Sequence, residues 1–157
     1  MFNFQHRQLK ERNKLKLFKL NQILNQKKFE IDLLLNNYSH LLTDLGKIEY
    51  VRRDLSLYNC HNLISLDNLN YVGMDLNLNG CSSLKEIPEN LFVAGTLFLN
   101  DTQITYIPES CRITRILSPF YRTKEDGEFL SYKKMFTSIE EFNNHYKAAN
   151  HIYEGYI

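Results

Sequence analysis

The most reactive side chains in this sequence stand next to each other, at Cys60 and His61. A cysteine becomes a nucleophile when a nearby base or cation favours its thiolate, so this pair is the first candidate for covalent catalysis. Adjacent residues in a strand or turn usually point away from each other, however. A second cysteine, Cys81, occupies the same position in a similar segment 21 residues later, which is typical of thiols stacked in a core. We therefore expect no catalytic residues and no enzymatic activity.

Metal and cofactor sites are not expected either. A zinc site needs about four Cys or His ligands close together, and no pair in this sequence has the C-x-x-C or H-x-x-x-H spacing that often supplies them. The five histidines are scattered along the chain. The sequence also lacks a phosphate-binding P-loop and a glycine-rich dinucleotide turn. It predicts a protein without a metal or a cofactor.

The cysteines and the apolar runs indicate the cellular environment. Three cysteines are an odd number, and two of them hold equivalent positions, so we expect buried thiols in a reducing compartment rather than disulfides. No apolar run approaches the roughly 18 residues of a membrane span, and the N-terminus lacks a secretory signal pattern. The sequence therefore predicts a cytoplasmic protein without a membrane partner.

Charge is distributed unevenly along the chain. The formal net charge is +1, but residues 1–30 carry eight Lys or Arg and two Glu, and residues 31–157 carry a net charge of −5. Two interpretations remain open: the solvated face of a structural helix, or an electrostatic patch for nucleic acid or an acidic partner. The candidate contact residues of such a patch are Arg7, Lys10, Arg12, Lys14 and Lys19.

Three segments share one pattern at constant spacing: IEYVRRDLSLYNCHNLISL, LNYVGMDLNLNGCSSLKEIP and LFVAGTLFLNDTQITYIP. Alternation of apolar and polar residues within each segment is typical of a strand with one buried face. A repeat of this length predicts a solenoid in which short parallel strands stack and each turn covers the next. The apolar positions that recur every 21 residues include Val51, Val72 and Val93, and Leu55, Leu76 and Leu97.

The pattern L-x-L-x-x-C followed by x-x-L-x-x-L/I-P, over about residues 45–108, resembles a leucine-rich repeat. Its last copy is similar to a repeat common in bacteriophage proteins, L-P-x-x-L-x-V-x-G-x-L-x-L-x-x-T-x-I-x-x-L-P. The resemblance implies an α/β leucine-rich-repeat solenoid and a phage or prophage origin, and hence the host-cell cytoplasm. The chain departs from the usual proline at Asp67 and from the usual asparagine at Cys60, Cys81 and Thr102.

The limits of the array are less regular than its centre. An earlier segment, FEIDLLLNNYSHLLTDL, overlays the first close repeat with Leu33 on Leu55, which favours a strand. A helix over residues 31–45 is the alternative, because apolar side chains there also recur at helical spacing. After the last close repeat, Pro119 cannot donate a hydrogen bond to a further strand, so the array should end near residue 118.

An open array needs a cover at each end. Residues 1–28 are predicted to form a basic amphipathic capping helix. At the other end, Ser138 and Glu141 have the spacing of a capping box, which predicts a helix over about residues 138–151. The apolar stripe expected to pack on the array from the N-terminal helix consists of Leu9, Leu17, Leu20, Ile23 and Leu24.

These elements predict one domain over residues 1–157. The repeat array occupies residues 29–118, between the N-terminal helix and a C-terminal cap at 119–157. Within this cap, residues 119–137 are expected to form a loop or an irregular hairpin.

The outward residues of the strands form the candidate binding face, because the strand leucines should point inward. A polar outward row is expected on any solvated sheet, but Tyr58 and Phe98 favour a partner-binding surface, since exposed aromatic residues often anchor interfaces. The candidate partner-binding residues are Asp54, Ser56, Tyr58, Asp75, Asn77, Asn79, Thr96, Phe98 and Asn100.

The sequence therefore favours a protein–protein interaction scaffold. The resemblance to phage repeats implies an accessory protein that binds and inhibits a host factor, such as the nuclease of a CRISPR-type antiviral defence. Two alternatives remain open: a nucleic-acid-binding accessory protein that uses the basic helix, and a structural component of a virion.

Overall fold

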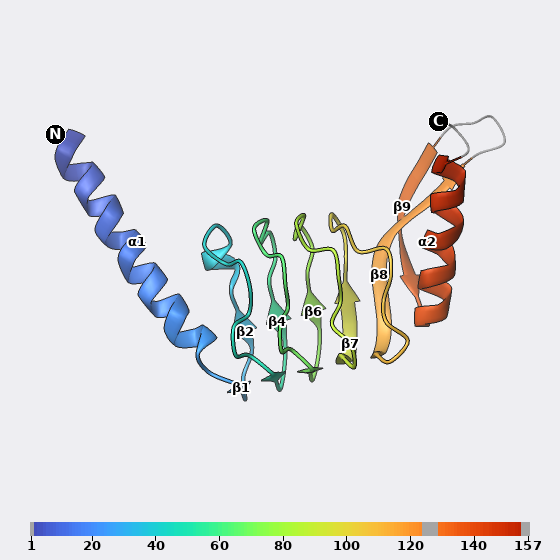
Figure 1. The fold of residues 1–157 in the computed structure, drawn as a ribbon, viewed down its shortest axis with the longest axis horizontal. Coiled ribbons are helices and arrows are strands. Elements are labelled where there is room, and N and C mark those ends of the chain that lie inside the picture. Colours follow the sequence, from blue (N-terminus) through green and yellow to red (C-terminus); the bar gives the residue numbers. More distant parts are fainter. Residues whose placement is uncertain (1, 124–128, 155–157) are drawn as a thin grey trace.

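The chain forms a parallel β-solenoid of about four turns, with a helix at each end (Figure 1). The structure is a computed structural model that describes residues 2–123 and 129–154, and side chains within 7–119 and 133–148. We call each turn of the solenoid a coil. The predicted stacking of repeats of about 21 residues, with parallel strands and flanking helices, is confirmed.

The first three coils each contribute two strands of two residues, and the longer β7 and β8 continue both of the resulting parallel ladders. The first ladder consists of β1 (Lys28–Phe29), β3 (Tyr50–Val51), β5 (Tyr71–Val72), the start of β7 (Phe92–Phe98) and the start of β8 (Arg112–Thr123). The second ladder consists of β2 (Leu33–Leu34), β4 (Leu55–Ser56), β6 (Leu76–Asn77), the end of β7 and the middle of β8. The two ladders meet at a corner between the paired strands of each coil.

The first coil is a true member of the array. Leu33 pairs with Leu55, and Leu55 pairs with Leu76, as the sequence overlay predicts. The alternative of a helix over residues 31–45 is wrong, since the helical structure there is a single 3-10 turn, Asn36–Tyr38. Inward-facing apolar residues of successive coils cover one another, which is why the strand pattern prevails over the helical spacing.

The core is a set of columns parallel to the solenoid axis. At each repeat position one apolar side chain stacks on its counterpart in the next coil, so every central coil is covered on both sides. The columns with the lowest exposure include Val51, Val72 and Val93; Leu55, Leu76 and Leu97; Leu57, Leu78 and Leu99; and Leu63, Leu84 and Ile104.

A repeated backbone conformation turns the chain after the second ladder. Asn59, Gly80 and Asp101 hold equivalent positions in successive coils, and all three have positive φ, at 60°, 79° and 57°. Asparagine, aspartate and glycine tolerate this left-handed region better than other residues do. At Gly80 a Cβ atom would overlap the side-chain oxygen of Asn59 in the previous coil, so a larger residue there would displace the Asn59 side chain.

The parallel array ends within β8. The last parallel pair is Phe98 with Leu117, and from Ile116 onward β8 also pairs in antiparallel fashion with β9 (Phe129–Phe136). The segment expected to be a loop or an irregular hairpin thus contains part of a regular antiparallel hairpin.

Helix α2 (Ile139–Glu154) covers this end of the solenoid (Figure 1). The Ser138 Oγ accepts a hydrogen bond from the Glu141 N–H at 3.0 Å, which confirms the predicted N-terminal cap. The Asn143 side chain exchanges two hydrogen bonds of 2.8 Å with the backbone N–H and carbonyl of Ile107. Phe142 is fully buried. These contacts attach α2 to the last coil.

Helix α1 (Phe2–Leu24) forms as predicted, but it caps the array only through its C-terminal end. Leu20 is buried, and Ile23 and Leu24 pack against the core. The prediction that the whole apolar stripe packs is wrong, since Leu9 is 51% and Leu17 is 46% exposed. The reason is geometric: α1 extends away from the first coil, so its earlier residues do not reach the solenoid (Figure 1). In the part of the chain that is described, no helix is both long enough and apolar enough to cross a membrane.

Candidate binding surface

The nine predicted face residues lie in three rows along the solenoid, and the first row joins neighbouring coils. The Asp54 Oδ1 accepts a hydrogen bond of 2.9 Å from the Asp75 N–H. The Asp75 Oδ1 accepts one of 2.7 Å from the Thr96 N–H, and the Thr96 Oγ1 accepts one of 3.2 Å from the Arg115 Nε. These polar side chains satisfy corner N–H groups that the β-ladders leave without carbonyl partners, so they stabilise the stack.

A second row, on the other side of β4, β6 and β7, also contributes to the stack. The Asn79 Oδ1 accepts hydrogen bonds from the Asn100 N–H at 2.8 Å and from the Asn100 Nδ2 at 3.0 Å. Asn100 is only 7% exposed, and its own Oδ1 has no donor among the described residues. The register explains this orphan oxygen: Asn100 lies two residues beyond the Phe98–Leu117 pair, opposite Pro119, which has no N–H. Tyr58, in contrast, is 47% exposed.

The third row points outward. We call it the outward row, and its members pair in register from strand to strand. Leu34 at the N-terminal end is 61% exposed, and the three predicted residues in the middle are half-buried. The outward row consists of Leu34, Ser56, Asn77, Phe98 and Leu117. Of the nine predicted residues, Tyr58 is the most exposed, and Phe98 is half-buried without a polar group that bonds a neighbouring coil.

A second surface lies on the first ladder, and sequence analysis missed it. Tyr50 and Tyr71 stack with ring centroids 4.6 Å apart and an interplanar angle of 11°. Tyr71 and Phe92 stack at 5.1 Å and 8°. The signal was present in the sequence, because an aromatic residue precedes each repeat valine at 21-residue spacing. The strand register holds these three rings in contact.

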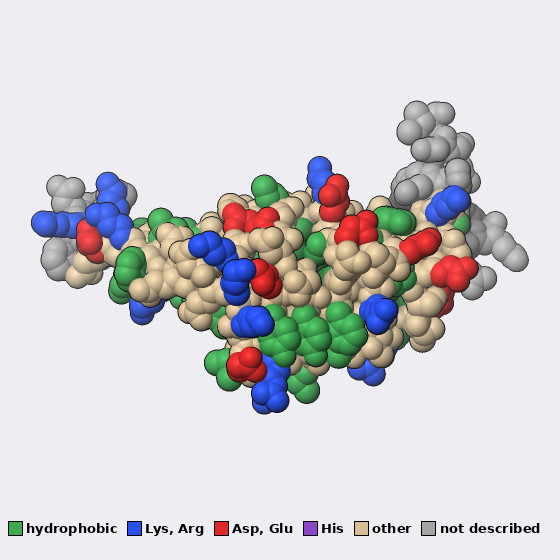
Figure 2. All heavy atoms as spheres, turned by 60° about the horizontal axis from the view of Figure 1, so that its bottom comes forward, with side chains coloured by type: hydrophobic (Ala, Val, Ile, Leu, Met, Phe, Trp, Pro, Cys, Tyr) green, Lys and Arg blue, Asp and Glu red, His purple; other side chains and the backbone are tan. Residues whose placement is uncertain are grey.

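At each end of the three stacked rings, the next residue across the ladder is cationic. The Lys28 Nζ lies 6.0 Å from the centroid of the Tyr50 ring, and Arg112 is the strand partner of Phe92. Among the described residues neither cation forms an ion pair, whereas the neighbouring Lys27 is paired with Glu49 at 2.6 Å. Figure 2 shows a continuous hydrophobic patch with Lys or Arg side chains at both ends on this face. We call Lys28, Tyr50, Tyr71, Phe92 and Arg112 the ladder strip.

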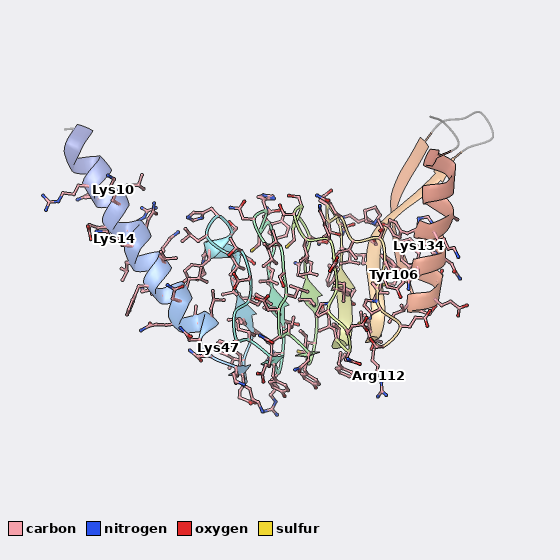
Figure 3. All side chains as sticks on the ribbon, viewed as in Figure 1. Lys10, Lys14, Lys47, Tyr106, Arg112 and Lys134 are labelled. Atoms are coloured by element: carbon pink, nitrogen blue, oxygen red, sulfur yellow. The ribbon has the colours of Figure 1, made fainter. Side chains whose placement is uncertain are left out.

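The basic residues of α1 lie apart from both surfaces. Arg7, Lys10, Arg12, Lys14 and Lys19 are all exposed. One of them, Lys14, forms a surface ion pair of 3.1 Å with Glu11. Lys10 and Lys14 lie on the part of α1 that extends beyond the solenoid, at the opposite end from Arg112 (Figure 3). Lys10 and Lys14 therefore lie beyond the first coil, away from the strands of the array.

The environment of the cysteines differs from that of a nucleophile. Cys60 and Cys81 are fully buried, and burial raises the pKa of their thiols to about 11 and about 12. The Cys81 Sγ donates a hydrogen bond of 3.1 Å to the Leu57 carbonyl. His61 is exposed while Cys60 lies in the core, so the two side chains point to opposite sides. Across the residues that the structure describes, no three His, Cys, Asp or Glu side chains cluster in a way that could hold a metal ion.

Comparison with known proteins adds no family: no protein-family model, no curated protein and no solved structure matches the chain significantly.

Proposed function

We propose that this protein is a non-enzymatic scaffold that binds a partner protein through the outward row and Tyr58. The observation that supports this proposal is the exposure of apolar side chains on a backbone that neighbouring coils hold in place on both sides. Phe98 and Tyr58 project from strands and turns whose neighbours are held by inter-coil hydrogen bonds. A preformed surface loses little conformational entropy on binding, and partly exposed aromatic residues are typical interface anchors.

The outward row is too small to form a stable interface alone. Strands about 4.8 Å apart and a few residues long give a face of roughly 150 to 200 Å², against about 800 Å² per partner in a standard interface. The partner must therefore also contact adjacent loops or another surface of the solenoid.

We also propose a biological role for this binding. The leucine-rich repeat that the sequence resembles, in its phage-like form, supports an accessory protein of a phage or prophage. Such a protein would occupy the host cytoplasm and inhibit a host factor, for example a nuclease of a CRISPR-type defence. This role rests on the resemblance of the repeat sequence.

A pull-down with a matched control tests the binding proposal. The protein and its Tyr58→Ala/Phe98→Ala variant are used as baits in host-cell lysate, with and without nuclease. Tyr106→Ala, at an exposed tyrosine away from the outward row, is the control. We expect a nuclease-resistant protein that binds the wild type and Tyr106→Ala but not the double variant. Equal capture by all three baits would contradict the use of this face.

One observation favours nucleic-acid binding as a second function. Arg7, Lys10, Arg12, Lys14 and Lys19 are exposed on a helix that extends into solvent, and among the described side chains Lys14 is the one of these five with a carboxylate partner. Phosphate contacts by such residues would make binding fall steeply with salt. Titration of labelled RNA and DNA at several salt concentrations, with wild type and Lys14→Glu, tests this function. Binding that depends on neither salt nor Lys14 would rule it out.

A further inference from the structure

We propose that the ladder strip is a docking site for an extended acidic segment of a partner protein. The segment would lie along the solenoid axis, with one carboxylate near Lys28 and one near Arg112. The proposal adds a second face to the protein-binding function, and it stands even if the outward row binds nothing.

The stacked rings determine which groups can contact them. Because the rings face each other at 4.6 and 5.1 Å, the faces between them are closed, and a ligand that lies along the row meets their outer edges and the phenol hydroxyls. The edge of an aromatic ring carries the positive part of its quadrupole. Neither the Tyr50 nor the Tyr71 hydroxyl has a hydrogen-bond partner among the described residues, so both remain able to donate. The strip therefore favours oxygen-rich or anionic groups.

The flank of the strip is low beside Tyr71 and Phe92, whereas Arg52, paired with Glu30, holds the equivalent position beside Tyr50. Gly73 and Ala94 each follow a stacked ring by two residues on the same side of the strand. A Cβ atom at Gly73 would overlap the Arg52 carbonyl and lie 3.2 Å from the Tyr71 Cε1, so the ring leans directly over this glycine. Small residues here leave the ring edges open to an incoming chain.

The two unpaired cations determine the spacing of the ligand. Lys28 and Arg112 are separated by four strand-to-strand steps, which is about 19 Å at about 4.8 Å per step. An extended peptide spans this distance with about six residues, at roughly 3.3 Å per residue. The ligand should thus carry acidic residues at positions i and i+6, with small hydroxyl-bearing residues such as threonine facing the rings at i+2 and i+4.

Charge also argues against a second copy of this chain as the occupant. If two strips met in antiparallel fashion, Lys28 of one copy would face Arg112 of the other, and like charges in contact are unfavourable. The exposed cations at both ends instead complement an acidic partner.

The test uses a blocked peptide of sequence Glu-Val-Thr-Val-Thr-Val-Glu, and a control peptide with lysine at both ends. Binding to the full-length protein is followed by the NMR signals of labelled Tyr and Phe rings. We expect the acidic peptide to shift the Tyr50, Tyr71 and Phe92 signals and the lysine peptide to leave them unchanged. Lys28→Ala and Arg112→Ala should each weaken binding by about threefold to fivefold, as for exposed ion pairs.

Two further variants keep the test specific. Tyr71→Phe preserves the stack but removes one hydroxyl donor, and it should weaken binding less than loss of a cation. Lys85→Ala removes an exposed cation away from the strip and should leave binding unchanged. No binding at millimolar peptide, or equal binding by the Lys28→Ala/Arg112→Ala double variant with its fold intact by circular dichroism, would overturn the proposal. The pull-down with Tyr58→Ala/Phe98→Ala reports separately on the outward row.

Discussion

Asp75 joins three successive coils, since its N–H donates to Asp54 and its carboxylate accepts from Thr96. Polarity and strand position predicted it on the binding face, and the structure places its carboxylate against the backbone of the next coil. An amino-acid pattern with a two-residue period identifies which side chains point outward, but it does not show which of them turn along the axis to bond a neighbouring coil. The Phe98 side chain has no hydrogen-bonding atom, and the only polar atom of the Tyr58 side chain is at the far end of its ring. Neither side chain can bond the adjacent backbone of a neighbouring coil, so their outward position could be predicted.

We predict that Asp75→Ala destabilises the protein by about 1 to 3 kcal/mol, because it leaves the Thr96 N–H without its acceptor. Asp75→Asn retains an oxygen at this position and should cost less. The free energy of unfolding is measured by urea denaturation, with Glu86→Ala as an exposed control. If Asp75→Ala were as stable as the control, the carboxylate would not join the coils.

The buried thiols predict a dependence of stability on pH. A thiol ordinarily ionises near pH 9, whereas burial raises the pKa of Cys60 to about 11 and that of Cys81 to about 12 in the folded protein. Above about pH 9 the unfolded chain therefore loses these protons first. The free energy of unfolding should be unaffected by the thiols below this pH and should fall as the pH rises toward the folded pKa values.

Urea denaturation under reducing conditions at pH 8, 9 and 10 measures this dependence. Between pH 8 and 10 the wild type should lose about 1 kcal/mol or more per buried thiol relative to Cys60→Ala and Cys81→Ala, for which the slope should be shallower. Identical slopes for wild type and variants would show that the thiols ionise equally in the folded and unfolded states.

At the scale of elements, the sequence pattern predicted the strand register and the start of α2, but it did not predict how much of α1 packs on the array. The 21-residue recurrence of Leu55 and its counterparts specifies strand register, because a slipped strand would expose the buried column. The cap of α2 was predictable from Ser138 and Glu141, since its contacts are local. The extent of packing of α1 was not predictable, because helical spacing identifies an apolar stripe but not the length of surface available to cover it.

We predict that deletion of residues 2–14 leaves the solenoid intact. The buried part of α1 begins near Leu20, and the nearest earlier contact is the hydrogen bond of 3.4 Å from the Lys16 Nζ to the Asn37 carbonyl. The thermal unfolding midpoint should therefore change by no more than a few degrees. A deletion that extends through Leu24 should destabilise the protein strongly, since it exposes the first coil. A large loss of stability in the shorter deletion would show that the early residues of α1 pack on the array.

At the scale of the whole molecule, the solenoid presents two outward surfaces on adjacent sides of one corner. The outward row and the ladder strip both run parallel to the axis, so each gains its length from the number of coils rather than from any single strand. Hydrogen bonds between neighbouring coils and the stacked apolar core make these surfaces rigid. No coil can fold alone, so a change that disrupts the stack of coils would also disrupt both binding surfaces.

The affinity of the purified partner for single variants tests the proposed binding face most directly, by calorimetric titration. We predict that Phe98→Ala weakens the affinity by roughly tenfold or more, as for an interface anchor of about 1.4 kcal/mol or above. Phe18→Ala removes the same side chain from α1, where Phe18 is 60% exposed, and should leave the affinity unchanged. The opposite result, with loss of affinity in Phe18→Ala and none in Phe98→Ala, would place the interface on α1 and contradict the account.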